Sequence, residues 1–132
     1  MFARRCVSVF SLLCLGSSII ACSNPSIVSI EITPTTQTFI GIGGQRAQFT
    51  AIGTFKQGDH IPTRQDITNV VTWKSNAVGV ATITSAGVAA PGGSYGSSDI
   101  TASMEGFTGL VTAHATVVVC QPDSTNPSKC AP

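Results

Sequence analysis

Apolar side chains recur at every second position in short runs between residues 27 and 119, and this alternation most constrains the fold. It predicts half-buried β-strands, because successive side chains of a strand point to opposite faces. The runs are 27–34, 45–55, 66–75, 80–83, 99–104 and 109–119. Turn-forming stretches separate them at 41–44, 56–62, 85–87, 91–98 and 105–107. We therefore expect an all-β domain, an antiparallel β-sandwich of about seven strands.

The alternation also predicts which side chains face the core. The expected inner faces are Val28, Ile30 and Ile32; Ala47, Phe49, Ala51 and Phe55; Ile67, Val71 and Trp73; Ile100, Ala102 and Met104; and Val111, Ala113, Ala115, Val117 and Val119. Trp73 is the sole tryptophan, and we expect it to fill the space between two sheets as a core marker. Its functional alternative is a platform on which a sugar ring stacks.

Composition supports a turn-rich β protein and argues against one class of partner. The chain has 13 glycines, seven prolines and many Thr, Ser and Val residues. Only 10% of its residues are charged, and the formal net charge is +1. Nucleic-acid-binding domains usually carry a clustered basic face, so we expect no nucleic-acid partner.

Residues 1–21 have the three parts of a secretory signal peptide. Arg4 and Arg5 form a cationic start, an apolar stretch follows up to Leu15, and small residues precede Cys22. A transmembrane helix is the alternative, but spanning takes about 20 predominantly apolar residues, and serines and a glycine interrupt this run. The arginine pair also suggests twin-arginine export, yet the residues after it do not resemble that motif.

Residues 19–22, Ile-Ile-Ala-Cys, resemble the lipobox of bacterial lipoproteins. The resemblance implies that Cys22 receives a lipid on its sulfur and becomes the first residue after signal cleavage. Residues 22–26 are then the lipidated cysteine and a short tether. Ser23 resembles the class sorted to the outer membrane where the host has two membranes. The expected location is the cell envelope, with the membrane as a partner through the Cys22 anchor.

Several motifs, in order, resemble the bacterial immunoglobulin-like domain of group 2, a module of intimin- and invasin-like surface proteins. They are Gly43-Gly44, Asp66-Ile67-Thr68, Trp73-Lys74-Ser75, Val80-Ala81-Thr82-Ile83, Gly87-Val88 and Asp99-Ile100-Thr101-Ala102. The resemblance covers residues 27–119 and implies an immunoglobulin-like sandwich. The connections at 56–65 and 91–98 are longer than the family pattern. No cysteine lies where antibody domains place their inter-sheet disulfide.

Residues 120–132 form a separate tail that is rich in proline and small polar residues. It holds Cys120 and Cys130, which we expect to pair in an oxidising compartment; otherwise the tail is disordered. Metal binding is the rival, although two cysteines without a nearby histidine make a poor zinc site. The chain has five cysteines, and Cys6 and Cys14 lie within the signal. Cys22 is then the odd cysteine.

The sequence contains no motif for catalysis or a resident cofactor. His60 lies in the long loop at 56–62, and His114 lies on the predicted solvent face of the last strand. Asp59, Asp66 and Asp99 could approach one another at a loop end and bind calcium, which needs six to eight oxygen ligands. We expect Asp66 instead to cap local backbone groups.

Tyr95, in the glycine-rich stretch 91–98, is the candidate ligand-contact residue. Packing of its ring over the edge of the sandwich is the alternative.

These observations lead to two classes of function for a non-enzymatic protein. The first is a lipid-anchored binding or adhesion module that contacts an unknown protein or glycan. The second is a structural accessory lipoprotein that docks to another envelope component without recognising a ligand. A single domain of this size cannot project far from a membrane, which favours contacts at short range.

Overall fold

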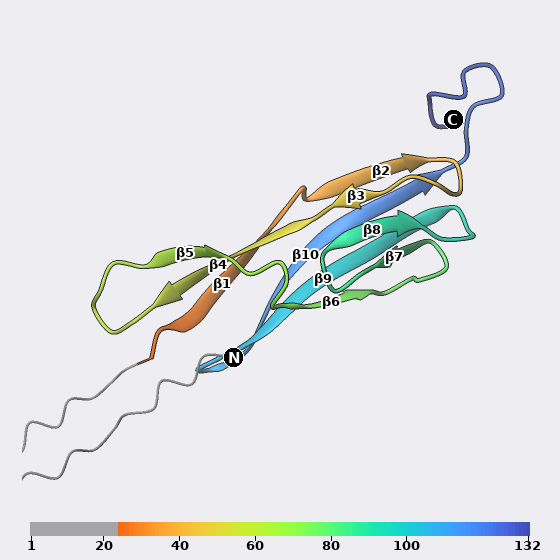
Figure 1. Cartoon of the computed structure of the whole chain (residues 1–132). Coiled ribbons are helices and arrows are strands. Elements are labelled where there is room, and N and C mark those ends of the chain that lie inside the picture. The colour runs from red at the N-terminus through yellow and green to blue at the C-terminus, as the bar shows by residue number, and fades with distance from the viewer. Residues whose placement is uncertain (1–23) are drawn as a thin grey trace, which may run out of the picture.

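The computed structural model describes residues 24–132 and consists of strands joined by turns and loops (Figure 1). The predictions for residues 1–21 and for Cys22 lie outside the described range. No helix occurs among the described residues. The strands are β1 (Ser26–Thr33), β2 (Thr36–Ile40), β3 (Ala47–Gln48), β4 (Thr50–Lys56), β5 (Thr63–Asp66), β6 (Thr72–Ser75), β7 (Ala81–Ile83), β8 (Val88–Pro91), β9 (Gly96–Gly106) and β10 (Gly109–Cys120).

The strands form three sheets that face one another in a sandwich-like arrangement. One sheet has the order β2-β10-β9-β6, and the other two have the orders β1-β4-β5 and β3-β8-β7. Across the layers, β1 contacts β9 and β10, while β7 contacts β6, β9 and β10. The two long strands β9 and β10 run along the length of the molecule (Figure 1). The chain therefore enters β1 at one end, and the tail leaves β10 at the other.

The β9–β10 hairpin is the most regular part of the fold. Gly106 pairs with Gly109 around a two-residue turn, and the antiparallel register continues to the pair of Gly96 with Val119. Valine-rich alternation over 109–119 favours an extended strand. In this register Ile100 lies opposite Ala115, and Ala102 lies on the same buried face as Ile100.

One apolar cluster forms the core between the layers. Its buried members are Ile27, Ile32, Phe39, Phe49, Ala51, Ile67, Val71, Trp73, Ala81, Ala89, Ile100, Ala102, Ala115, Val117 and Val119. These residues come from every sheet, and burial of their apolar surface is the main favourable contribution to folding. No disulfide joins the layers within the described residues.

The predicted inner face of the first strand is wrong at one position. Val28 is 52% exposed, whereas its neighbour Ile27 is 4% exposed. The pairing of β1 with β4 shifts register between Ile27 and Ser29, and an extra residue of this kind reverses the side-chain alternation. Ile32, beyond the shift, points inward as expected.

The predicted continuous strand at 66–75 is divided. β5 ends at Asp66, a turn occupies 67–71, and β6 begins at Thr72 in a different sheet. The backbone N–H groups of Val70 and Val71 both donate to the carbonyl of Ile67 and close the turn. Ile67, Val71 and Trp73 are all buried nevertheless, because the turn carries the chain from one layer to the other.

The second predicted strand is also divided, at Phe49. The backbone N–H of Phe49 donates to the carbonyl of Gly87 over 2.8 Å, between β3 and β4. Gly87 has φ +76°, and a Cβ at this position would lie 2.5 Å from the Phe49 carbonyl oxygen. Glycine is therefore required at this approach of two backbones. Phe49 itself is fully buried, as the alternation predicted.

The expectation of about seven antiparallel strands needs two further corrections. The described residues form ten strands, since two of the six predicted runs are each divided between two strands and β2 and β8 were not predicted. The pairing is also not entirely antiparallel, because β2 runs parallel to β10, from Thr36 opposite Thr116 to Ile40 opposite Cys120. A cis peptide bond between Thr33 and Pro34 lies at the corner between β1 and β2.

Candidate functional site

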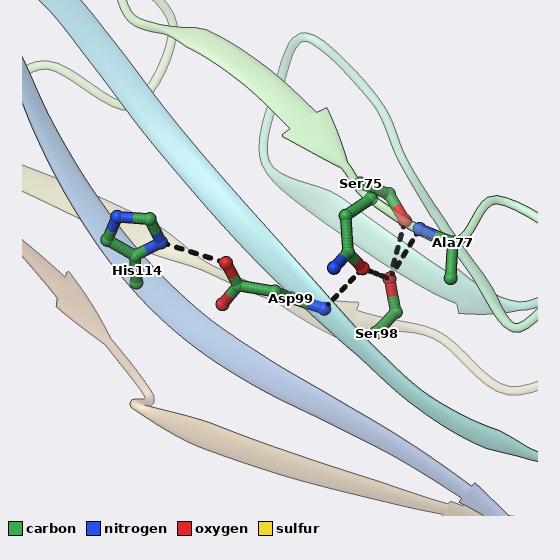
Figure 2. Close-up of polar contacts among 6 residues, drawn as sticks. Ser75, Ala77, Ser98, Asp99 and His114 are labelled. Atoms are coloured by element: carbon green, nitrogen blue, oxygen red, sulfur yellow. Dashed lines mark hydrogen bonds and ion pairs between the residues drawn. The ribbon is translucent and has the colours of Figure 1, made fainter.

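An exposed acid–base pair lies on the outer face of the β9–β10 ribbon. Asp99 Oδ2 is 2.8 Å from His114 Nδ1 (Figure 2). The two side chains are 40% and 61% exposed, respectively. Thr116 pairs with Asp99 and Thr101 pairs with His114, so the two residues are diagonal neighbours on one face. The solvent-facing orientation predicted for His114 is the one observed.

A hydroxyl network lies on the opposite side of the same strand. Ser98 is 2% exposed, and its Oγ is 2.7 Å from Ser75 Oγ. The backbone N–H of Ala77 donates to Ser98 Oγ, while Asn76 Oδ1 accepts from the Ser98 hydroxyl and from the Asp99 N–H. This network joins the end of β6 to the start of β9 (Figure 2).

The sequence Ser98-Asp99 next to His114 brings together residue types used in hydrolytic triads, but not their geometry. A nucleophilic serine must lie within hydrogen-bond reach of its base. Adjacent strand residues point to opposite faces, so Ser98 lies inside while Asp99 and His114 lie outside (Figure 2). Ser98 Oγ is already bonded to Ser75 and Asn76. The hydroxyl network of Ser98 therefore holds two strands together, and the Asp99–His114 pair is a separate, exposed contact on the other face.

The aspartates considered for calcium are not gathered into one site. Asp99 lies on β9, Asp66 ends β5, and Asp59 lies in the β4–β5 loop with His60. Within residues 24–132, no three His, Cys, Asp or Glu side chains form a group that could hold a metal ion. Asp66 instead accepts from the backbone N–H of Thr68 at 2.9 Å, which caps the turn after β5. The Thr68 hydroxyl and this N–H hold the pKa of Asp66 below its usual value.

Trp73 lies in the core and is 8% exposed. Its ring N–H donates to the carbonyl of Thr68 over 2.8 Å. The Thr68 hydroxyl accepts from the backbone N–H of Ala51, so this buried threonine joins β4, the crossing turn and Trp73. With its ring packed and its nitrogen satisfied, Trp73 does not offer a stacking face to a sugar.

Tyr95 lies in the short loop between β8 and β9 and is 46% exposed. The loop is held by two backbone hydrogen bonds, from Gly92 to Val80 and from Ser94 to Gly79. The tyrosine is therefore presented from a supported turn at the end of the molecule where β9 begins. The glycine content of the sequence did not indicate this support.

The tail is closed by the expected disulfide between Cys120 and Cys130. An isolated bridge pairs Pro122 with Cys130, and the Ala131 N–H donates to the Gln121 carbonyl. Asp123 accepts from the N–H and hydroxyl of Thr125, which lowers the pKa of its carboxyl. The Gly41 N–H donates to the Cys120 carbonyl and joins the β2–β3 loop to the base of the tail.

A surface hollow of about 810 Å³ lies at the opposite end and was not predicted from the sequence. Its lining includes Asn24, Ile27, Lys56, Phe107 and Val111. The backbone N–H of Phe107 donates to Ser26 Oγ over 2.8 Å, which ties the β9–β10 turn to the start of β1. The one sequence signal for this hollow was Phe107, which lies in a turn flanked by glycines, since such turns usually carry polar residues or glycine.

No helix in residues 24–132 is long and apolar enough to cross a bilayer.

Comparison with curated proteins gives a partial similarity. No family model matches the chain. Ice-binding protein 1 of Shewanella frigidimarina (strain NCIMB 400) is 43% identical to it over 79 residues. The match covers 59% of this chain and 8% of that protein, so the chain spans a small part of this relative's length.

Proposed function

We propose that this protein is a lipid-anchored, non-catalytic binding or adhesion module of the cell envelope, which contacts a protein or a glycan. Its membrane partner is the bilayer that holds the lipid on Cys22, which is the outer membrane where the host has two. The ice binding named for the partial relative is not part of this proposal, because the match covers only 8% of that protein.

The observation that carries the proposal is the placement of the two ends of the domain: the chain enters at one end, and three loops lie at the other. β1 begins at Ser26, four positions after Cys22. The Tyr95 loop, the β2–β3 loop and the tail lie at the other end of the long strands (Figure 1). An anchor on Cys22 therefore leaves these three supported loops facing away from the bilayer, where a ligand would meet them.

Strand connectivity supports an immunoglobulin-like sandwich as the scaffold. The first two strands divide between opposite layers, with β1 on β4 and β2 on β10. The chain crosses from β5 to β6 between layers, and β6 then pairs with β9. The 79-residue similarity to a small part of a much longer protein is consistent with a module that is reused in other chains.

The accessory role is the second candidate, and the size of the domain favours it. The longest strand, β10, has 12 residues, or about 40 Å at full extension. A single domain of this length meets partners close to its own membrane. In this role the same distal loops dock to a neighbouring envelope protein.

Anchoring is tested by Cys22→Ala in the full chain. We expect the variant to keep its signal segment and to leave the membrane fraction, since the thiolate is the nucleophile for lipid attachment. Mass spectrometry of the N-terminus and membrane fractionation measure these outcomes. Unchanged processing and fractionation would contradict the anchor.

Binding is tested with the anchored protein and with Tyr95→Ala. Arrays of glycans and matrix proteins, together with envelope-protein crosslinking, separate the two candidates. Array binding that Tyr95→Ala weakens supports the binding or adhesion module. Crosslinking to one envelope protein, with no array signal, supports the accessory role. Thr112→Ala, an exposed change on β10, is the matched control.

A further inference from the structure

The chain enters β1 at one end of the molecule, here called the basal end. Large apolar side chains are highly exposed at this end. It comprises the start of β1, the β4–β5 loop at 57–62 and the β9–β10 turn at 107–108 (Figure 1). Phe107 is 91% exposed and Ile61 is 89% exposed, more than any other large hydrophobic residue among those described. Val28 near the start of β1 and Leu110 near the start of β10 are also exposed, at 52% and 62%.

The basal hollow connects two of these apolar side chains, Phe107 and Val28, to the entering chain. Phe107, Val28 and Val111 line it together with Asn24 and Lys56. The hydrogen bond from the Phe107 N–H to Ser26 Oγ holds the turn beside the start of β1. Phe107 is therefore fixed in position although its ring is in solvent, and contiguous apolar exposure of this kind marks an interaction surface.

The length of the preceding chain identifies what covers this surface. Asn24 lines the hollow, and Cys22 lies two residues earlier. Two residues span at most about 7 Å. A lipid on Cys22 would consequently enter the bilayer close to the hollow that Asn24 and Phe107 both line, so the lipid surface is the nearest partner for this end of the molecule.

We propose that the basal end rests on the membrane, with Phe107 and Ile61 inserted at the boundary between headgroups and acyl chains. This inference rests on the anchoring proposed above and adds a second contact to it. Apolar side chains of peripheral proteins reach about 5–10 Å into this boundary. Lys56, on the lining, lies at the level of the lipid phosphates. Asp59 and Glu105 are on adjoining segments, so apolar insertion rather than charge provides the contact.

The proposal is tested with single-cysteine variants of the full-length lipoprotein. Cys22 carries the lipid and Cys120 pairs with Cys130, so Phe107→Cys supplies one free thiol for an environment-sensitive fluorophore. The matched control is Tyr95→Cys, separated from residue 107 by the whole 11-residue β9, about 35–40 Å. Ile61→Cys is the second basal site. All three positions are exposed, so the substitutions do not disturb the core.

In vesicles that contain lipids brominated on the upper acyl carbons, the label at 107 and at 61 should shift to shorter wavelength and lose emission. The label at 95 should do neither. A water-exposed label at both basal sites, in protein that sediments with the vesicles, would overturn the docking and leave the anchor intact. Protein that stays in solution with an uncut signal would overturn both.

Discussion

The sandwich body and the tail are stabilised by different means. The body, residues 26–119, holds a 15-residue apolar cluster and no disulfide. In the tail, residues 120–132, no side chain is buried, and the order comes from the Cys120–Cys130 bond and a few turn hydrogen bonds. Burial suffices where the sequence alternates, whereas a covalent link takes its place where apolar residues are missing. Breaking each kind of contact should therefore have very different effects on unfolding.

The largest effect is expected from Phe49→Ala. Phe49 is fully buried, and truncation of a core phenylalanine leaves a cavity that costs about 3–5 kcal/mol. Chemical denaturation monitored by Trp73 fluorescence measures the loss. Phe107→Ala is the matched control, because that ring is 91% exposed and its removal should change the free energy of unfolding by less than about 0.5 kcal/mol. Equal losses would contradict the assignment of the core.

Thr68→Val should have a smaller but clear effect. The substitution keeps the shape of the side chain, but it leaves the buried Ala51 N–H without its 3.0 Å acceptor. An unsatisfied buried donor costs about 1–3 kcal/mol. Thr112→Val on the exposed face of β10 controls for the change of side chain, and the difference between the two midpoints of unfolding reports the buried hydrogen bond.

Replacing both Cys120 and Cys130 with serine should loosen the tail and leave the body nearly unchanged. The bond closes a segment of sequence separation 10 that contributes nothing to the apolar cluster. Removal of a native disulfide from a small secreted domain typically costs about 2–5 kcal/mol of stability. Because this bond lies outside the core, we expect the body to lose less than about 1 kcal/mol. Proteolysis within 121–129 should become fast. A body destabilised as strongly as by Phe49→Ala would show that the tail belongs to the same folding unit.

The smallest effects concern Asp66 in the body and Asp123 in the tail. Hydrogen bonds from Thr68 and Thr125, respectively, lower both pKa values below 3.8. A carboxyl with a depressed pKa stabilises the folded form above its unfolded pKa, and this contribution is lost as pH falls through the folded value. NMR titration of the carboxyl carbons should therefore give two midpoints below 3.8.

Two variants separate these carboxyls. Thr125→Val should raise only the Asp123 midpoint, and Thr68→Val only that of Asp66, since each threonine hydroxyl acts on its own partner. Loss of the tail disulfide should also raise the Asp123 midpoint if the turn at 123–125 opens with it. A coupled change at Asp66 would indicate that the tail and the crossing turn communicate.

The sequence predicted the regular parts of this fold and misplaced the irregular ones. The alternation of apolar residues correctly located β9, β10 and the buried face of β10. It succeeded there because the two strands pair with each other in one continuous antiparallel register. It failed at Val28, where one extra residue reverses the faces, and at 67–71, where a turn keeps apolar residues buried while the backbone changes layers. β2 has one fully buried residue, Phe39, and a partner about 80 positions away, so no local signal marks it.

The candidate sites divide in the same way. The pairing of Cys120 with Cys130 was expected for an oxidising compartment, and the structure contains this disulfide. The contact of His114 with Asp99 depends on strand register, which a single sequence does not give. The basal hollow needs the start of β1, the end of β4 and the β9–β10 turn together, and these segments are distant in the chain.

The parallel ladder between β2 and β10 has a mechanical consequence. A pull on the protein between Cys22 and a partner that grips the tail would draw the β2 side toward the basal end and the C-terminal end of β10 the opposite way. Five paired positions, from Thr36 with Thr116 to Ile40 with Cys120, would then bear the load together in shear. A ladder loaded in this direction resists force far better than one peeled open pair by pair. Tension applied along the long axis would thus meet this parallel ladder in shear.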